Sequence, residues 1–185
     1  MVFQEYVPTV TEQTARVGRL DLALHEQGHT WRLYPVVEAR QAVRGGQCTV
    51  AGTTVAALGA LTRFEPPRQL LHDLGLTPAE YSSGGRRQQG SLTKTGNPHA
   101  RRALVAGAWA YRYPATGSRH LQRRLEKRPA ALQAISWKAQ VRLCKRYRHL
   151  MAKGTKAHPV VVAMARALRA LMWAMAKHMA VTPQA

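Results

Sequence analysis

Apolar residues recur along most of the chain three or four positions apart, which is the spacing of α-helices. From about residue 9 to residue 29 the segment is polar, and its thin apolar seam consists of Val10, Val17, Leu20 and Leu24. So narrow a seam buries too little apolar surface to stabilise a helix in isolation. The pattern therefore predicts a long polar helix that needs a partner helix.

Two further helices are predicted on either side of a pair of glycines. The first covers residues 36–43, Gly45 and Gly46 end it, and the second runs from about 49 to 61. A helix, a tight glycine turn and a second helix form the layout of a helix-hairpin-helix, whose turn amides contact a DNA backbone without reading its sequence. Any helical hairpin also needs such a turn, so a purely structural role is an open alternative.

The middle of the chain has a different character. Pro66 and Pro67 open a short helix that Gly75 ends. Residues 77–97 are rich in glycine and contain no long apolar run, which predicts a loop or a short hairpin. Asn97 can cap the helix that follows, because its side chain can accept hydrogen bonds from the first free amides.

Amphipathic helices are predicted again after Asn97. The first leaves Arg101 and Arg102 outside, and its buried stripe comprises Ala100, Ala103, Leu104, Gly107, Ala108 and Tyr111. Two longer helices are predicted over about 129–152 and 159–179. The last contains two arginines within its apolar run and is short for a membrane span, so we expect a buried helix.

Together these patterns predict an all-α, or mainly α, fold in three parts. Residues 1–30 form a coiled-coil-like helix, residues 31–80 a region like a helix-hairpin-helix, and residues 81–180 a basic region. The basic region combines the glycine-rich loop with a helical bundle.

Charge is distributed very unevenly along the chain. The 185 residues carry 28 Lys and Arg against 9 Asp and Glu, a formal net charge of +19. Residues 1–80 hold seven basic and eight acidic side chains, whereas residues 81–185 hold 21 basic side chains and one acid, Glu126. Such a concentration of like charge is repulsive unless a polyanion is near, so we expect a nucleic-acid partner. The alternatives are a solvated basic surface and an RNA-packed protein of the ribosomal kind.

Cysteine usage and the amino terminus indicate where the protein works. Cys48 and Cys144 are too few and too far apart for a CxxC metal site or a disulfide framework. The first residues lack the basic region and apolar core of a signal peptide. We expect a reduced, cytoplasmic setting without membrane contact.

One short motif matches a zinc-binding pattern. His25-Glu26-Gln27-Gly28-His29 fits H-E-x-x-H, which on a helix places two imidazoles on one face around a zinc ion. Only 24 residues precede it, and the residues that follow do not supply the third ligand of a metzincin. We therefore interpret the match as a coincidence on a polar helix.

The glycine-rich segment is a better candidate for chemistry. Two serines precede a glycine pair, and arginines follow it: Ser82, Ser83, Gly84, Gly85, Arg86 and Arg87. A serine attacks a phosphate only when its deprotonation is assisted and the developing charge is stabilised. The planar guanidinium group of arginine can donate two parallel hydrogen bonds to a phosphate. Glycines have no side chain and allow a DNA backbone to come close. The same residues also suit a loop that grips phosphate without chemistry, and that interpretation stays open.

A series of short motifs is more specific. F-x-x-P-R-Q-L, L-G-L-T-P, S-G-G, T-K-x-G-N and R-R follow one another between Phe64 and Arg102. This run resembles the carboxy-terminal transposase domain of the insertion-sequence 110/116/902 family, relatives of the Piv invertase, and the similarity covers about residues 31–177. In that family this domain supplies a serine that attacks DNA, and a separate amino-terminal RuvC-like domain supplies an acidic metal cluster. The resemblance also implies a bacterial, nucleoid-associated protein that forms homo-oligomers, and some members are guided by an RNA that the element encodes.

The site residues are transferred to this chain by their positions in the motifs. The family serine precedes the glycine, which makes Ser83 the expected nucleophile and Ser82 the alternative. From their charge and position we expect nucleic-acid contacts at Gly84, Gly85, Arg86, Arg87, Lys94, Gly96, Asn97, Arg101 and Arg102. Gly45, where we also expect a nucleic-acid contact, matches the first hairpin glycine of the family, whereas Gln47 stands where many members have a second glycine.

The chain departs from the family at its amino terminus. Only polar helix precedes Trp31, and the acids are too scattered for a two-metal site. No cofactor is expected in this chain, and Mg²⁺ is expected only together with the missing amino-terminal domain. The expected function is that of a truncated DNA transposase or recombinase part that binds DNA and supplies the serine but is inactive alone. The alternative is a non-catalytic DNA- or RNA-binding module.

Overall fold

The structure, a computed structural model, describes residues 2–59, 64, 67–86, 88–126 and 128–181. Within this part the fold is mainly α, as predicted, and one two-stranded sheet lies in its middle. In chain order the elements are α1 (Val2–Gly28), α2 (Tyr34–Gln41), α3 (Cys48–Leu58), α4 (Pro67–Asp73), β1 (Pro78–Glu80), β2 (Gln89–Leu92), α5 (Pro98–Ala108), the 3₁₀-helix η2 (Trp109–Arg112), α6 (Arg119–Glu126), α7 (Ala130–Ala152) and α8 (Ala157–Val181).

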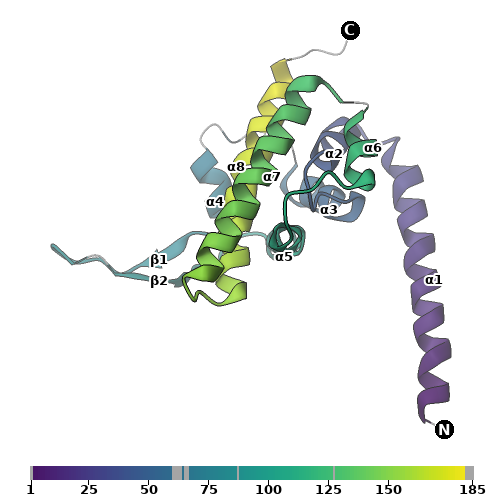
Figure 1. Cartoon of the computed structure of the whole chain (residues 1–185), viewed down its shortest axis with the longest axis horizontal. Helices are drawn as coiled ribbons and strands as arrows, with labels where there is room; N and C mark the ends of the chain where they lie inside the picture. Colours follow the sequence, from purple (N-terminus) through teal and green to yellow (C-terminus); the bar gives the residue numbers. More distant parts are fainter. Residues whose placement is uncertain (1, 60–63, 65–66, 87, 127, 182–185) are drawn as a thin grey trace.

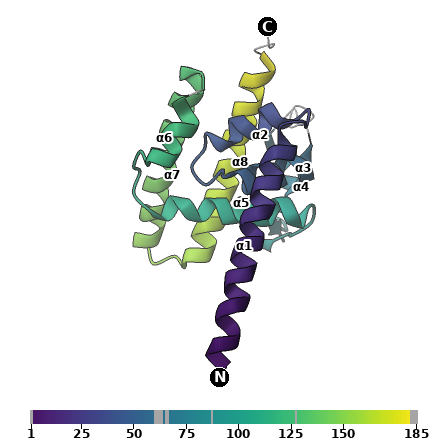
Figure 2. The same cartoon turned by 90° about the vertical axis from the view of Figure 1, so that its right-hand side faces the viewer.

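The helices pack around α8. The long helices α7 and α8 lie side by side, and α5 crosses them (Figures 1 and 2). On the other side of α5, α2 and α3 form a helical pair. α1 extends away from the body at one side, and the β1–β2 hairpin projects at the other (Figure 1). The molecule therefore presents two protrusions on a helical centre.

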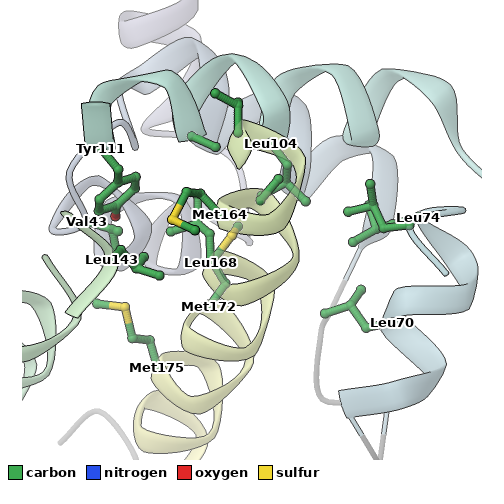
Figure 3. Close-up of a cluster of buried hydrophobic side chains, with 14 of the residues drawn as sticks. Val43, Leu70, Leu74, Leu104, Tyr111, Leu143, Met164, Leu168, Met172 and Met175 are labelled. Atoms are coloured by element: carbon green, nitrogen blue, oxygen red, sulfur yellow. The ribbon is translucent and has the colours of Figure 1, made fainter. Parts of the chain in front are cut away.

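The described residues form two apolar clusters, of which the smaller, made by Val37, Ala51 and Val55, joins α2 to α3. The larger cluster is the main core and joins the parts of the chain before and after residue 80. It contains side chains from α5, α7 and α8 and from the segments around α2 and α4 (Figure 3): Val43, Leu70, Leu74, Leu104, Tyr111, Leu143, Met164, Leu168, Met172 and Met175. Full burial of an aliphatic side chain of this size contributes about 1.5–3 kcal/mol. The predicted stripe of α5 is thus confirmed, α7 buries one face in the same core, and α8 is the buried helix that was expected. Among the described residues, no helix combines the length and apolar character of a membrane span.

α1 carries its apolar seam on an exposed surface. The exposed fractions of three of its residues, Val10, Val17 and Leu20, are 62%, 58% and 60%. The helix begins at Val2 and continues through Pro8, whereas the prediction placed its start near residue 9. The apolar seam that defined the predicted helix begins only at Val10, so the first turns of α1 gave no periodic signal.

α6 is absent from the predicted elements. Half of its eight residues are charged, and one apolar side chain, Leu121, is buried. The Ser118 hydroxyl accepts a hydrogen bond from the Leu121 amide, which is the arrangement of a helix cap. The end of the third predicted helix, residues 60 and 61, lies outside the described residues.

A bidentate ion pair ties α2 to the segment before α7. The two guanidinium nitrogens of Arg128 lie 3.0 and 2.9 Å from the two carboxylate oxygens of Glu38. Hydrogen bonding from Arg128 holds the pKa of Glu38 below its ordinary value. The same hydrogen bond raises the pKa of Arg128.

We expect this pair to stabilise the fold by about 1 kcal/mol at neutral pH. Because the pKa of Glu38 is lowered on folding, the contribution is complete above the ordinary carboxyl pKa and is lost as the pH falls through the lowered value. A double-mutant cycle of Glu38→Gln and Arg128→Gln, measured by urea unfolding at pH 7 and pH 3, gives the coupling energy. An equal coupling energy at both values of pH would contradict this assignment.

Candidate nucleic-acid interface and serine hairpin

The glycine-rich segment forms a projecting β-hairpin. β1 and β2 are antiparallel, with Pro78 opposite Leu92 and Glu80 opposite Gln89. Beyond the strands, the Tyr81 amide donates to the Gln88 carbonyl at 2.9 Å. Figure 1 shows the hairpin extending clear of the helical body. The prediction of a loop or short hairpin over residues 77–97 is therefore confirmed as a hairpin.

The tip of the hairpin carries the serine expected to be the nucleophile. Ser83 and Arg86 form an isolated bridge, in which the Arg86 amide donates to the Ser83 carbonyl at 3.3 Å. Gly84 between them has φ +59°, and nothing lies within 4 Å of a side chain built at Gly84 or Gly85. Both serines and Arg86 are exposed. The turn thus places a serine and an arginine opposite each other, both exposed, with open space around the two glycines between them. Arg87 lies outside the described residues.

A carboxylate lies next to the other serine. The Ser82 hydroxyl donates to Oε1 of Glu80 at 2.9 Å. Glu80 is the last residue of β1, so the i, i+2 relation of an extended chain brings the two side chains to one face. In the sequence, Glu80 is only one of the scattered acids. The extended conformation of residues 80–82 is the signal that would have paired it with Ser82.

The base of the hairpin is held against the end of α4. Gly96 has φ +92°, and a methyl group there would meet the Asp73 carbonyl oxygen at 2.2 Å. Arg101, expected outside, is half-buried, and its Nη1 donates to the Leu74 carbonyl at 3.1 Å. This corrects its predicted exposure, because that nitrogen completes the last turn of α4. Lys94 and Arg102 are exposed.

Asn97 caps α5, as predicted. Its Oδ1 accepts hydrogen bonds from the amides of His99 and Ala100, at 2.9 and 3.1 Å, and its Nδ2 donates to the Ala57 carbonyl of α3 at 3.3 Å. One side chain therefore fixes the start of α5 and links it to α3. Its predicted nucleic-acid contact has to be compatible with these three bonds.

We expect Asn97→Ala to lower the free energy of unfolding by about 1–2 kcal/mol, because two amides and one carbonyl lose their partner. Asn97→Asp keeps the acceptor and should lose less than half of that. Chemical denaturation of both variants measures the difference. Equal losses in the two variants would show that the cap is unimportant here.

The turn between α2 and α3 has a clear internal role. A methyl group at Gly45, where φ is +79°, would meet the carbonyl oxygen of Gly107 in α5 at 2.1 Å. The Gly46 amide donates to the Val43 carbonyl at 2.9 Å. Gly45 thus allows the turn to touch α5 directly. The helix-hairpin-helix assignment and a DNA contact at Gly45 stay predictions.

The H-E-x-x-H motif lies at the carboxyl end of α1. The rings of His25 and His29 are 4.8 Å apart, and the Tyr34 hydroxyl lies 3.2 Å from Nε2 of His29. Within the described ranges, no three His, Cys, Asp or Glu side chains form a group that could hold a metal ion.

Comparison with known proteins identifies the class to which this arrangement belongs. Residues 41–124, from the end of α2 into α6, match the model of the transposase IS116/IS110/IS902 family. The chain therefore carries the transposase domain of this family, as its motifs predicted.

Individual relatives agree with the family match. A transposase of Sinorhizobium fredii is 44% identical over 147 residues, which cover 80% of this chain and 38% of that protein. A family 20 transposase of Pseudomonas aeruginosa is 32% identical over 127 residues, or 66% of this chain and 37% of the relative. The transposase of insertion sequence element IS1533 from Leptospira borgpetersenii is 41% identical over 59 residues, covering 32% of this chain and 17% of the relative. The chain spans less than two fifths of the length of each of these relatives.

Proposed function

We propose that this chain is a DNA-binding, serine-bearing part of a transposase, in which Ser83 is the nucleophile of strand exchange. The observation that carries the proposal is the exposed Ser83–Arg86 turn at the tip of a projecting hairpin, within the segment that matches the transposase family. A projecting tip can reach a phosphate that the helical body cannot approach. The +20 charge of residues 81–185 favours a polyanionic substrate.

The proposed step exchanges one phosphate ester for another. Oγ of Ser83 forms a bond to phosphorus, the bond from phosphorus to one deoxyribose oxygen breaks, and the serine proton is transferred by way of a base to that leaving oxygen. Arg86 stabilises the charge on the phosphate oxygens. The phosphoserine link keeps the ester, so a new deoxyribose hydroxyl can reverse the step and rejoin the strand.

Glu80 is the base that the hairpin offers nearest to the serines. It accepts the hydroxyl hydrogen bond of Ser82, which precedes Ser83 in the chain. Ser82 is therefore the alternative nucleophile of the proposal. Mg²⁺ would enter only through the acidic domain of the family, and neither that domain nor a guide RNA contributes a step here.

The experiment mixes the purified chain with element-end DNA, with and without the amino-terminal part of the Sinorhizobium relative. We expect an adduct that survives denaturation to form only in the complete mixture and to disappear in Ser83→Ala, while DNA binding is unchanged. Ser82→Ala is the matched control, and it should keep the adduct. Loss of the adduct in Ser82→Ala alone would transfer the role to that serine.

The alternative is a binding module without chemistry, favoured by the basic side chains of residues 81–185, which can bind a polyanion without any reaction. It predicts salt-sensitive DNA or RNA binding and no adduct in any mixture. That result would refute the catalytic part of the proposal and leave the binding part.

A further inference from the structure

The exposed half of α7 is cationic from Lys138 to the carboxyl end of the helix. Its buried half faces the core through Leu132, Leu143 and Tyr147. Five lysines and arginines and no acid lie on the helix, and one more lysine is its C-cap; all six are exposed: Lys138, Arg142, Lys145, Arg146, Arg148 and Lys153. We call these six residues the α7 face. None of them belongs to the family motifs between Phe64 and Arg102.

Nothing in the described part of the chain neutralises the α7 face. None of its six side chains has a hydrogen bond or an ion pair with a described residue, and the Glu38–Arg128 pair lies elsewhere. Lys138, Arg142 and Arg146 follow one another at i, i+4 spacing, at which like charges repel. A helix with this pattern is stabilised when an anion with regularly spaced charges lies along it.

The width of the helix favours duplex DNA over duplex RNA as the partner of the α7 face. A helix with its side chains is about 10–12 Å wide, which matches the major groove of B-form DNA, about 12 Å wide. The major groove of A-form RNA is too narrow for side chains to enter. Helical periodicity places Arg146 and Arg148 near opposite edges of the exposed half, with Lys145 between them. Cations at both edges can contact the phosphates on both sides of one groove.

Two exposed apolar side chains lie beside these cations. Trp137 is 50% exposed and Val141 is 41% exposed. By helical periodicity both lie on the Arg148 side of the face. Exposed apolar groups are unfavourable in water, but in a major groove they can contact thymine methyl groups.

We propose that the α7 face docks into the major groove of duplex DNA, as a contact separate from the serine hairpin. This inference rests on the proposed function, because the α7 face would bind the same DNA that the serine hairpin would attack. α7 is fixed to the core by its buried half, so the groove contact would hold the DNA relative to the hairpin.

The test compares two triple variants of equal charge in the complete chain. Lys145→Gln/Arg146→Gln/Arg148→Gln removes three cations of the α7 face, and Arg16→Gln/Arg19→Gln/Arg32→Gln removes three exposed cations from α1 and the turn after it. Binding to a 30-base-pair DNA duplex and to the RNA duplex of the same sequence is measured over a salt series. We expect the α7 variant to bind DNA at least about tenfold more weakly, with a salt slope smaller by about 2.7, and the α1 variant to bind like the unmodified chain.

A second measurement does not depend on mutations. Acetylation of Lys138, Lys145 and Lys153 should slow at least about fivefold when the DNA duplex is bound, and the RNA duplex should protect them less. Equal losses in the two triple variants, unprotected lysines, or equal behaviour toward DNA and RNA would overturn the inference. Each of these results leaves the serine adduct experiment to decide the proposed function independently.

Discussion

Gly45→Ala should lower the free energy of unfolding by about 3 kcal/mol or more. Two separate costs combine at this position. The backbone has φ +79°, a left-handed conformation that costs a residue with a side chain about 1 kcal/mol. The added methyl group would also stand 2.1 Å from the Gly107 carbonyl oxygen, and backbone on both sides prevents an easy adjustment.

Gly154→Ala is the matched control for this prediction. Gly154 has the same φ of +79°, but nothing lies within 4 Å of a methyl group there. We expect a loss of about 1 kcal/mol, which represents the conformational cost alone. Urea unfolding followed by circular dichroism at 222 nm measures both variants. If the two losses were equal, the contact between the α2–α3 turn and α5 would not exist as described, and a DNA role for Gly45 would become the better explanation.

The fold follows from the sequence wherever a helix has a regular apolar stripe. α5, α7 and α8 were predicted to within a few residues, because each buries one face against the core. α6 was missed because a single buried leucine gives no periodicity to detect. The packing of α8 at the centre could not be derived, since periodicity identifies the buried face of a helix but not its partner.

The sequence motifs were enough to choose the candidate residues, but they did not reveal which of these residues also stabilise the fold. The motifs located Ser83 and Arg86, and the structure places them on an exposed turn. Gly96 and Arg101 were expected to contact DNA, yet each also has a packing or hydrogen-bonding role at the hairpin base. Contacts between residues more than 20 positions apart, such as Arg101 with Leu74, leave no local pattern. The DNA contacts of these residues stay predictions.

Arg40→Met should raise the free energy of unfolding by about 1–3 kcal/mol. Arg40 lies on α2 with 2% of its surface exposed, and all three of its guanidinium nitrogens are buried without a hydrogen-bond partner among the described residues. Burial lowers the pKa of Arg40 to about 10, and no carboxylate counteracts this shift. Because the folded-state pKa lies below the ordinary value, the cost is fully present at neutral pH and fades only above about pH 10. Methionine is also long and unbranched, so it can fill the space of the arginine side chain without a charge.

Arg44→Met is the control, because Arg44 is a neighbouring arginine with a partner. Its Nη1 donates to the Pro114 carbonyl at 2.6 Å, so this variant should lose about 1 kcal/mol while Arg40→Met gains stability. Thermal and urea unfolding at pH 7 measure the change in the free energy of unfolding, which should be positive for Arg40→Met and negative for Arg44→Met. A loss of stability in Arg40→Met would mean that the guanidinium has a stabilising partner in solution, which would contradict its assignment as an unpaired buried charge. A gain would show that α2 carries a cation that the stability of the fold does not require, and DNA-binding assays of the same variant would then test whether the cation serves the substrate.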